Sequence, residues 1–480
     1  MRPRPIAPGL ALAALCGLGG IPGCQMYQPA PIDPAAHDAA WLARTPADAS
    51  VLEFARGLGG ADLPGAFDPA DGLDLREAEV VALVYNPELR VARLRAGVAA
   101  ATAEFAGLWD DPEFSIDVLR IVEGVPDPWI ISPGLSLTIP ISGRLEAEKA
   151  RADAGHRAVL AGVAEREWQT RVEVRRAWLE WSAARLRADE TERLLGTIDA
   201  VVGSAQRLAQ AGEIPRTEAV LFEIERADQR RALLRHRGEA AVGEQRLRGL
   251  MGLSPAAGVQ FVPSLAVPVE AEGGSPPLER SPSLARLRAE YDEAEARLLG
   301  EVRRQFPDLV IGPQFESDQG QSRIGLVGGI PIPILNANRQ GIAEGEAERA
   351  LAAAAYEGER ERLSGAWSQA LARLALEREQ FEVLEGTMAP LVDRQLADAQ
   401  RLVELGEGGV IVLLESLSRA AQTRMQVIDA RLGIALGQTE LAAIAGPPGP
   451  PEPLELSEPS GSTFPAAIGE NASSEVESHP

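Results

Sequence analysis

The 480-residue chain has few of the residues that usually form chemical sites: two cysteines and four histidines. Cys16 falls in a segment that we expect to be removed, so Cys24 would be the only cysteine of the mature chain. An intrachain disulfide and a CxxC metal site are then excluded. His156 and His236 lie among Ala, Arg and Leu and are predicted to be surface residues. With no Ser-His-Asp order or phosphate loop, we expect no enzyme activity, cofactor or metal site.

Aromatic residues are scarce, and basic residues are fewer than acidic ones. Aromatics make up 4% of the chain, whereas Ala, Leu, Arg and Glu are abundant, a composition that favours long helices. The net charge of −23 argues against a nucleic-acid partner, because phosphate binding requires a basic face. The simplest interpretation of the acidic excess is a solvated helix surface.

No apolar run near the start is long enough to span a bilayer as a helix. The run Ala7–Leu18 follows basic residues and is short and Gly-rich, which predicts an export signal over residues 1–23. Ile21-Pro22-Gly23-Cys24 resembles a bacterial lipobox, in which Cys24 would be lipidated, and two acyl chains give a stable anchor. By analogy with bacterial lipoprotein sorting, Gln25 in place of Asp indicates the outer membrane.

The chain repeats itself at a spacing of about 195 residues, which indicates a tandem duplication. The matching pairs are Asn86-Pro87-x-Leu89 with Ser281-Pro282-x-Leu284, Pro112 with Pro307, Gly143-Arg144 with Asn338-Arg339, and Arg207-Leu208-x-x-x-Gly212-Glu213 with Arg401-Leu402-x-x-x-Gly406-Glu407.

Each copy contains two segments in which apolar and polar residues alternate, the pattern of a strand with one apolar face. We expect strands at about 112–121 and 129–141, and at about 307–316 and 322–334. Phe114, Ile116 and Val118 would face outward, and Ser115 and Asp117 inward. These lengths match those of tilted strands that cross a bilayer.

Long proline-free stretches follow the strands in both copies. The stretches 143–209 and 339–389 predict helices of up to about 65 residues, or roughly 100 Å at 1.5 Å per residue. A second helical run returns in each copy, so two antiparallel helical hairpins are expected. An earlier helix is predicted from Asp74, an N-cap with Glu77 three residues on, to about Trp109.

These patterns divide the chain into six parts. We expect a signal over 1–23, an extended lipidated arm over 24–72, a first repeat over 73–253, a connector over 254–280, a second repeat over 281–446 and a disordered tail over 447–480.

Four amphipathic strands cannot stand alone in a membrane. Open sheet edges would leave backbone groups unsatisfied in hydrocarbon, at several kcal/mol each. Single-chain barrels begin at about eight strands, so closure requires several chains, and three copies would supply twelve strands. A coiled-coil envelope lipoprotein without a pore is the alternative. It would require sustained heptads, whereas Ala is spread broadly around these helices.

The order of the short motifs resembles the TolC family of outer-membrane efflux proteins over about residues 73–446. The motifs are Asn86-Pro87-Glu88-Leu89, Ile139-Pro140-Ile141 before Gly143-Arg144, Gly212-Glu213-Ile214, and Ile330-Pro331-Ile332-Pro333-Ile334-Leu335-Asn336-x-Asn338-Arg339-Gln340-Gly341-Ile342. The last is similar to the branch that serves heavy-metal cation efflux. The implied fold class is an α+β membrane protein: a homotrimeric 12-stranded β-barrel with four strands per chain, continued by a long periplasmic α-helical barrel and duplicated within the chain.

The resemblance implies an outer-membrane exit duct that passively conducts substrates from an inner-membrane pump, of which the resistance-nodulation-division type is one candidate. A periplasmic adaptor would dock at the helix turns Gly212, Glu213, Ile214 and Gly406, Glu407, Gly408. The same fold also serves as the duct of type I protein secretion, which stays open as an alternative.

Acidic residues near those turns could ring a narrowed mouth after threefold repetition and favour cations. They are Glu213, Glu218, Glu404, Glu407 and Glu415. The plainer interpretation is that the glycines supply positive φ at ordinary helix turns and that the carboxylates are solvated.

Overall fold

The structure is a computed structural model that describes residues 27–58, 67–122, 124, 126–267, 274–318, 321–405 and 409–447. The predicted signal, Cys24, the turn residues 406–408 and the tail from residue 448 lie outside this range. The chain divides into two compact units, up to Arg44 and from Thr45 onward. The first contains α2 (Pro34–Leu42), where the Asp33 carboxylate accepts a hydrogen bond from the N–H of Ala36 (3.1 Å).

The second unit starts with α3 (Ala49–Gly57), although an extended arm was expected over 24–72. That expectation is wrong for α2 and α3. Val51 and Ala55 share one face of α3 and are buried in a core cluster that also contains Val81 and Trp178. Local composition conceals this helix because its stability comes from packing against other elements.

Asn86 divides the expected helix from Asp74 to Trp109 into α5 (Leu75–Tyr85) and α6 (Pro87–Glu104). The capping box of Asp74 and Glu77 at the start of α5 is confirmed. Pro87 disfavours a helical conformation at Asn86, whose side chain instead accepts hydrogen bonds from the N–H groups of Glu88 (3.0 Å) and Leu89 (3.1 Å).

The four strands form one antiparallel sheet in the order β1-β2-β3-β4. Their bounds are β1 Glu113–Arg120, β2 Trp129–Ile139, β3 Leu309–Asp318 and β4 Gln321–Gly329. The fourth strand was expected to reach residue 334 and ends five residues earlier. Pro331 and Pro333 follow closely, and proline has no N–H to donate to a ladder.

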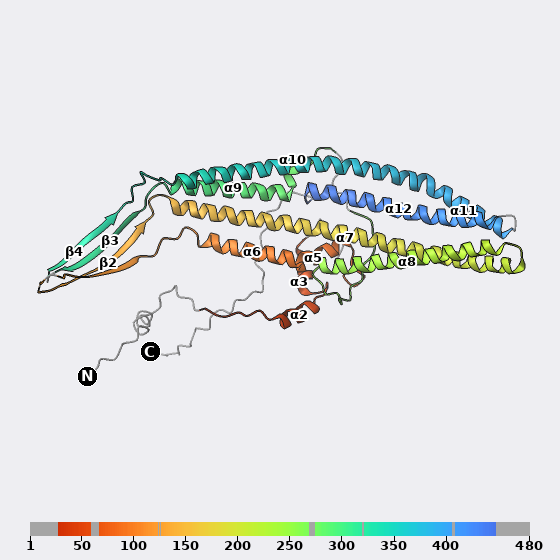
Figure 1. Cartoon of the computed structure of the whole chain (residues 1–480), viewed down its shortest axis with the longest axis horizontal. Coiled ribbons are helices and arrows are strands. Elements are labelled where there is room, and N and C mark those ends of the chain that lie inside the picture. The colour runs from red at the N-terminus through yellow and green to blue at the C-terminus, as the bar shows by residue number, and fades with distance from the viewer. Residues whose placement is uncertain are drawn as a thin grey trace, which may run out of the picture. The chain divides into compact units, whose positions relative to one another are not determined.

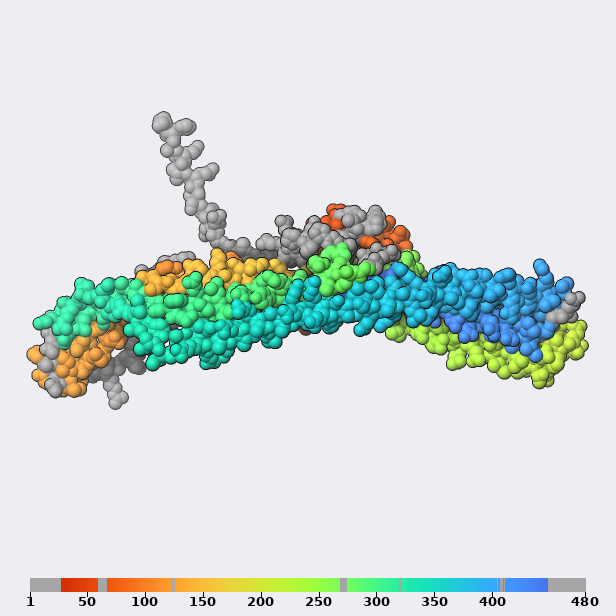
Figure 2. Space-filling view, turned by 90° about the horizontal axis from the view of Figure 1, so that it is seen from above, coloured from red at the N-terminus to blue at the C-terminus, as the bar shows by residue number. Residues whose placement is uncertain are grey.

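Helices make up most of the rest of the described second unit. The sheet lies at one end, and the end of α7, the start of α8, the end of α11 and the start of α12 lie at the other (Figure 1). Figure 2 shows α10 running along one face beside α9. The elements are α7 (Arg144–Ala211), α8 (Arg216–Leu250), η1 (Leu278–Arg280), α9 (Pro282–Arg303), α10 (Arg339–Val383), the π-helix η2 (Leu384–Met388), α11 (Ala389–Glu404) and α12 (Val410–Ala445).

Both copies of the repeat start their long helix from a left-handed residue. Gly143 precedes α7 with φ 72°, and Asn338 precedes α10 with φ 51°. Glycine and asparagine tolerate this region better than other residues. The copies differ further on, since α7 is unbroken over 68 residues, whereas α10 passes through η2 into α11. Pro390 would clash with the carbonyl of Gly386 in a regular helix, and the wider π turn accounts for its tolerance.

Two of the buried clusters hold the long helices together, one near the middle of α7 and one toward the turns. Near the middle of α7, Trp178, Trp181 and Phe261 stack edge to face, with ring centroids 5.3–5.7 Å apart. Toward the turns, a second cluster joins α7, α8, α11 and α12 around Phe222 and Leu417. None of the helices in the described part combines the length and apolar character that a membrane-spanning helix requires.

Candidate functional site

The register of the sheet separates its side chains into an apolar face and a polar face. On the apolar face Phe114 pairs with Leu135 and Val118 with Ile131. The pairing continues through Ile139 with Leu309 and Phe315 with Ile324. Large apolar side chains on this face are exposed in the chain, for example Phe114 (68%) and Leu326 (71%). This face therefore matches an apolar environment outside the chain.

The opposite face consists mainly of polar residues and glycine. Ser115 pairs with Gly134, Gly134 with Gln314, and Gln314 with Gly325. The face also carries Glu113, Asp117, Glu316, Asp318 and Arg323, together with the apolar Leu119, Ile130, Val310 and Val327. Such a surface is suited to contact with water.

The outer edges of the sheet have no partner strand within the part of the chain that the structure describes. β1 pairs only with β2 and β4 only with β3, and every residue of both strands is exposed. Their free N–H and C=O groups form templates for pairing with another chain.

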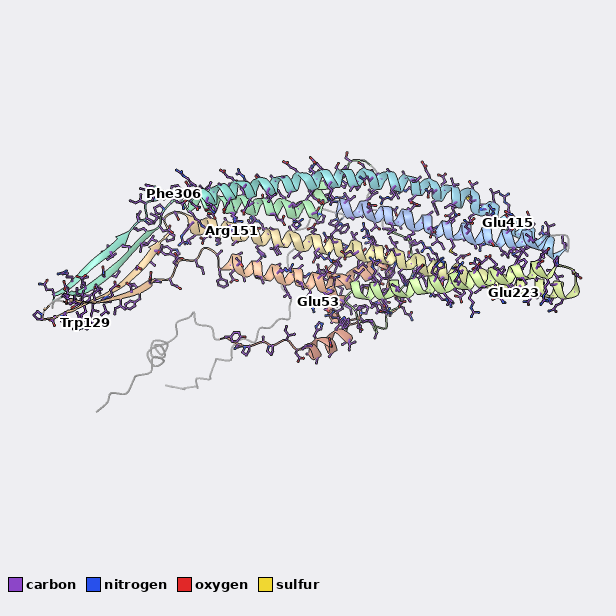
Figure 3. The ribbon with its side chains drawn as sticks, viewed as in Figure 1. Glu53, Trp129, Arg151, Glu223, Phe306 and Glu415 are labelled. Carbon is purple, nitrogen blue, oxygen red and sulfur yellow. The ribbon has the colours of Figure 1, made fainter. Side chains whose placement is uncertain are left out.

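An aromatic residue marks the end of the sheet farthest from the helices. Figure 3 shows Trp129 there, with Glu223 and Glu415 toward the opposite end of the second unit. The Arg120 guanidinium lies 5.5 Å from the centre of the Trp129 ring, a cation–π distance. Tryptophan beside a basic residue is typical of a membrane–water interface.

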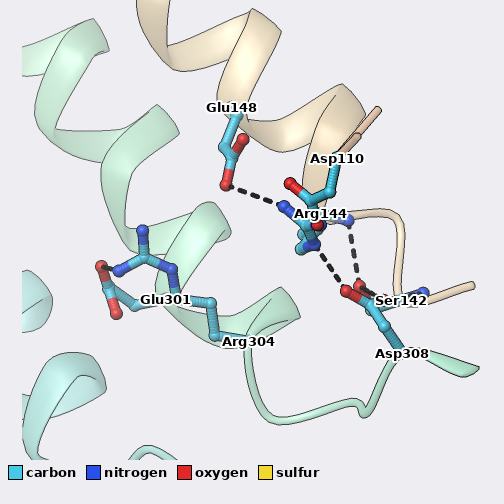
Figure 4. A network of polar contacts seen from close by, with 7 residues as sticks. All are labelled: Asp110, Ser142, Arg144, Glu148, Glu301, Arg304 and Asp308. Carbon is cyan, nitrogen blue, oxygen red and sulfur yellow. Dashed lines mark hydrogen bonds and ion pairs between the residues drawn. The ribbon is translucent and has the colours of Figure 1, made fainter. Parts of the chain in front are cut away.

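A polar network ties the sheet to the helices, centred on Arg144 at the start of α7 (Figure 4). Its Nε lies 2.5 Å from Asp308 Oδ2, and its Nη2 lies 2.5 Å from Asp110 Oδ2. The Ser142 hydroxyl donates to Asp308 Oδ1 (2.8 Å). Burial raises the pKa of Asp308, but the hydrogen bonds from Arg144 and Ser142 outweigh it and hold the pKa below its ordinary value.

The second repeat uses a different contact at the corresponding position. The Asn338 amide donates to the carbonyl oxygen and to Oε2 of Glu301, both at 2.8 Å. The hydrogen bond from Asn338 lowers the pKa of Glu301, with burial opposing it and Arg304 assisting. Both networks were missed from the sequence alone. Three residues were available as signals: Gly143 and Asn338 before the long helices, and Asp308 after Pro307.

The first predicted adaptor turn is an ordinary helix end. Gly212 has φ 76°, and the Glu213 N–H donates to the carbonyl of Leu208 (2.9 Å). Ile214 packs into the cluster that joins the two helical hairpins, so these hairpins lie side by side. Gly406, Glu407 and Gly408 lie outside the described residues, and adaptor docking stays a prediction at both turns.

The predicted acidic mouth is described only in part. Glu213 is exposed, Glu218 is half-buried, and Glu415 is exposed and pairs with Arg419 (3.4 Å). Glu407 and the side chain of Glu404 lie outside the description. The acidic ring also stays a prediction.

The two central histidines differ from the expectation of surface residues. His236 is 7% exposed and its Nδ1 lies 3.2 Å from Glu239 Oε2, and His156 is half-buried. Glu239 stands one helical turn after His236, so the sequence already contained the signal. Among the described residues, no three His, Cys, Asp or Glu side chains gather in a way that could hold a metal ion.

Comparison with known proteins identifies similar chains. No protein-family profile matches. The chain is 27% identical over 298 residues to the cobalt-zinc-cadmium resistance protein CzcC of Cupriavidus metallidurans, covering 60% of this chain and 68% of that one.

Solved structures share the fold. CusC, a protein that forms a transmembrane channel, has a TM-score of 0.67 at 17% identity, over 78% of this chain and 93% of its own. The outer membrane protein VceC of Vibrio cholerae has a TM-score of 0.65 at 16% identity, over 78% and 96%. The outer-membrane channel OprN has 0.66 at 16%, over 78% and 90%. The resemblance to the TolC family and the predicted fold of a single chain, four antiparallel strands continued by long helices, are thereby confirmed. The homotrimer with its 12-stranded barrel stays a prediction.

Proposed function

We propose that the chain forms the outer-membrane exit duct of a tripartite efflux system, as a homotrimer that passively conducts substrates from an inner-membrane pump to the exterior. Three four-stranded sheets would close into a 12-stranded barrel, with β1 of one copy beside β4 of the next.

The observation that carries this proposal is the two-faced sheet with two open edges. Its apolar face suits lipid, its polar face suits a water-filled lumen, and its edges need partners, because unpaired backbone groups are costly in hydrocarbon. A non-pore coiled-coil lipoprotein would have no use for these three features together.

The helices support the same assembly. At 68 residues, α7 spans about 100 Å, a length suited to bridging part of a cell envelope. Exposed apolar side chains lie on helices at the flanks of the chain: Leu94 (67%) and Val98 (70%) on α6, Leu351 (70%) on α10 and Val242 (72%) on α8. Neighbouring copies would cover them.

The partners and the anchor in this proposal are those that the sequence motifs predict. The turns at Gly212, Glu213, Ile214 and at Gly406, Glu407, Gly408 would contact a periplasmic adaptor, and Cys24 would carry the lipid anchor after the signal is removed. The likeness to a cobalt-zinc-cadmium resistance protein favours a metal-cation efflux system with a pump of the resistance-nodulation-division type.

Bilayer conductance and gel electrophoresis test the duct. Discrete channel events from an SDS-resistant, heat-dissociable trimer are expected. A closed periplasmic end would suppress conductance, so the measurement is repeated with Glu404→Ala and Glu407→Ala together. Silence from that variant, with a monomer on the gel, would reject the duct in favour of a coiled-coil scaffold.

A further inference from the structure

We infer that the polar face of the sheet, through Glu113 and Asp117, makes the outer lumen favour cations over anions. This inference rests on the proposed function, because that face borders a lumen only in the closed barrel. It assigns charge preference to the strands, in addition to any effect of the helix turns. No ion needs to bind, because the preference comes from the field of fixed charges.

The register sets the charge of this face. Four carboxylates, Glu113, Asp117, Glu316 and Asp318, lie on it, against a single guanidinium, Arg323. The register that pairs Asp117 with Ser132 and Glu316 with Arg323 places all of these charges on the same side as Ser115 and Gln314. The apolar face carries Arg120 at its rim, beside Trp129.

Arg323 is already engaged by two of the acids. Its Nη1 lies 3.1 Å from Glu316 Oε1, and its Nη2 lies 3.6 Å from Asp318 Oδ2. One guanidinium thus offsets part of the charge of two carboxylates near the far end of the β3–β4 hairpin. Its influence on the remaining acids is correspondingly weak.

Unlike Glu316 and Asp318, Glu113 and Asp117 have no arginine partner within the described residues. Both are exposed on β1, and within the described residues neither side chain has a hydrogen bond or an ion pair. Their cross-strand neighbours are Ser136 and Ser132, which carry no charge. Threefold repetition would place six such carboxylates around the lumen. The base on the strand next to them would be Arg323 on β4 of the next copy, which already pairs with two acids of its own hairpin.

Ser115 is the natural reporter position, because it lies between the two acids on the same face. Two residues along a strand span roughly 7 Å, so a group at position 115 is near both carboxylates. At that distance in water, two charges should change the local ratio of cationic to anionic reagents by about tenfold at low salt, and less as salt screens them.

Thiol labelling from outside the cell tests this without requiring an open periplasmic end. Ser115→Cys is introduced into the full chain and treated with a cationic and an anionic methanethiosulfonate of similar size. Each rate is divided by that reagent's rate with a small free thiol, and the parent chain gives the background. Neighbouring acids also raise the pKa of the introduced thiol, but this slows both reagents alike and leaves their ratio unchanged.

We expect the cationic reagent to react about tenfold faster at low salt. The ratio should fall toward one when Glu113→Gln and Asp117→Asn are added, take intermediate values with either alone, and rise with Arg323→Gln. Each variant must run as the same oligomer as the parent. A ratio near one in Ser115→Cys, or one that the neutralised acids leave unchanged, overturns the inference.

Ile116→Cys separates this failure from failure of the duct. Its side chain lies on the apolar face and should react slowly with both reagents if that face contacts lipid. Equal, fast labelling at positions 115 and 116 would reject the barrel, and the inference with it. Fast labelling at 115 alone with no charge preference would leave the duct intact and reject only the inference.

Discussion

At the scale of single residues, Arg144 connects parts of the chain that are distant in sequence. It reaches Asp110 after α6, Glu148 within α7 and Asp308 just before β3. A planar guanidinium can donate to several carboxylates at once, whereas lysine acts as a point charge. One side chain therefore links the start of β3 to the helices.

Arg144→Ala should lower the free energy of unfolding by about 2–3 kcal/mol, because it leaves the mostly buried Asp308 without its charged partner. Arg144→Lys should recover part of this loss. Urea unfolding of the purified protein measures both. Arg151→Ala, at an exposed position on the same helix, is the control and should change stability by less than about 0.5 kcal/mol.

The effect of Arg144→Ala should depend on pH. The folded-state pKa of Asp308 lies below its ordinary value of 3.8, so its ionisation stabilises the fold above that value and ceases to do so as the pH falls through the lowered pKa. The difference between the wild type and Arg144→Ala should thus shrink in acid. A difference that stays constant from neutral pH to below 3 would contradict this account.

At the scale of elements, sequence patterns predicted what local rules control. Alternation located the strands and placed Ser115 and Ile116 on opposite faces, and the absence of proline located the long helices. Sequence patterns did not predict α3 or η2. α3 is stabilised by packing in the cluster that contains Val81 and Trp178. η2 absorbs Pro390 inside a helix that sequence rules would end there.

The end of α8 provides the second stability prediction. Gly252 follows this helix with φ 67°, and a Cβ there would collide with the carbonyl of Tyr85, beside the Asn86 break. Gly252→Ala should cost about 2–4 kcal/mol from left-handed strain and overlap. Gly249→Ala, inside α8 with open space around it, should be neutral or stabilising by up to about 1 kcal/mol. Equal unfolding midpoints for the two variants would contradict the argument.

At the scale of the whole molecule, one chain contains only a third of the proposed pore. The faces of its sheet could be predicted from the sequence because period-two alternation is local. The acidic mouth could not be settled in this way, because the separation of Glu213, Glu218 and Glu415 from their symmetry copies depends on how the hairpins assemble.

Charge placed on either face of β1 tests the assembled barrel. Ile116→Arg puts a guanidinium on the proposed lipid face, where a charge near the bilayer midplane costs about 2–4 kcal/mol per copy. Ser115→Arg adds the same charge one residue away, on the face toward the lumen. We expect the Ile116→Arg trimer to dissociate at a lower temperature on SDS gels and to be depleted from outer-membrane fractions. The Ser115→Arg trimer should resemble the parent.

Both variants introduce the same side chain at neighbouring positions of β1, so the main difference between them is the face of the sheet on which the new charge lies. Equal loss of the trimer in both would mean that the sheet does not separate lipid from water.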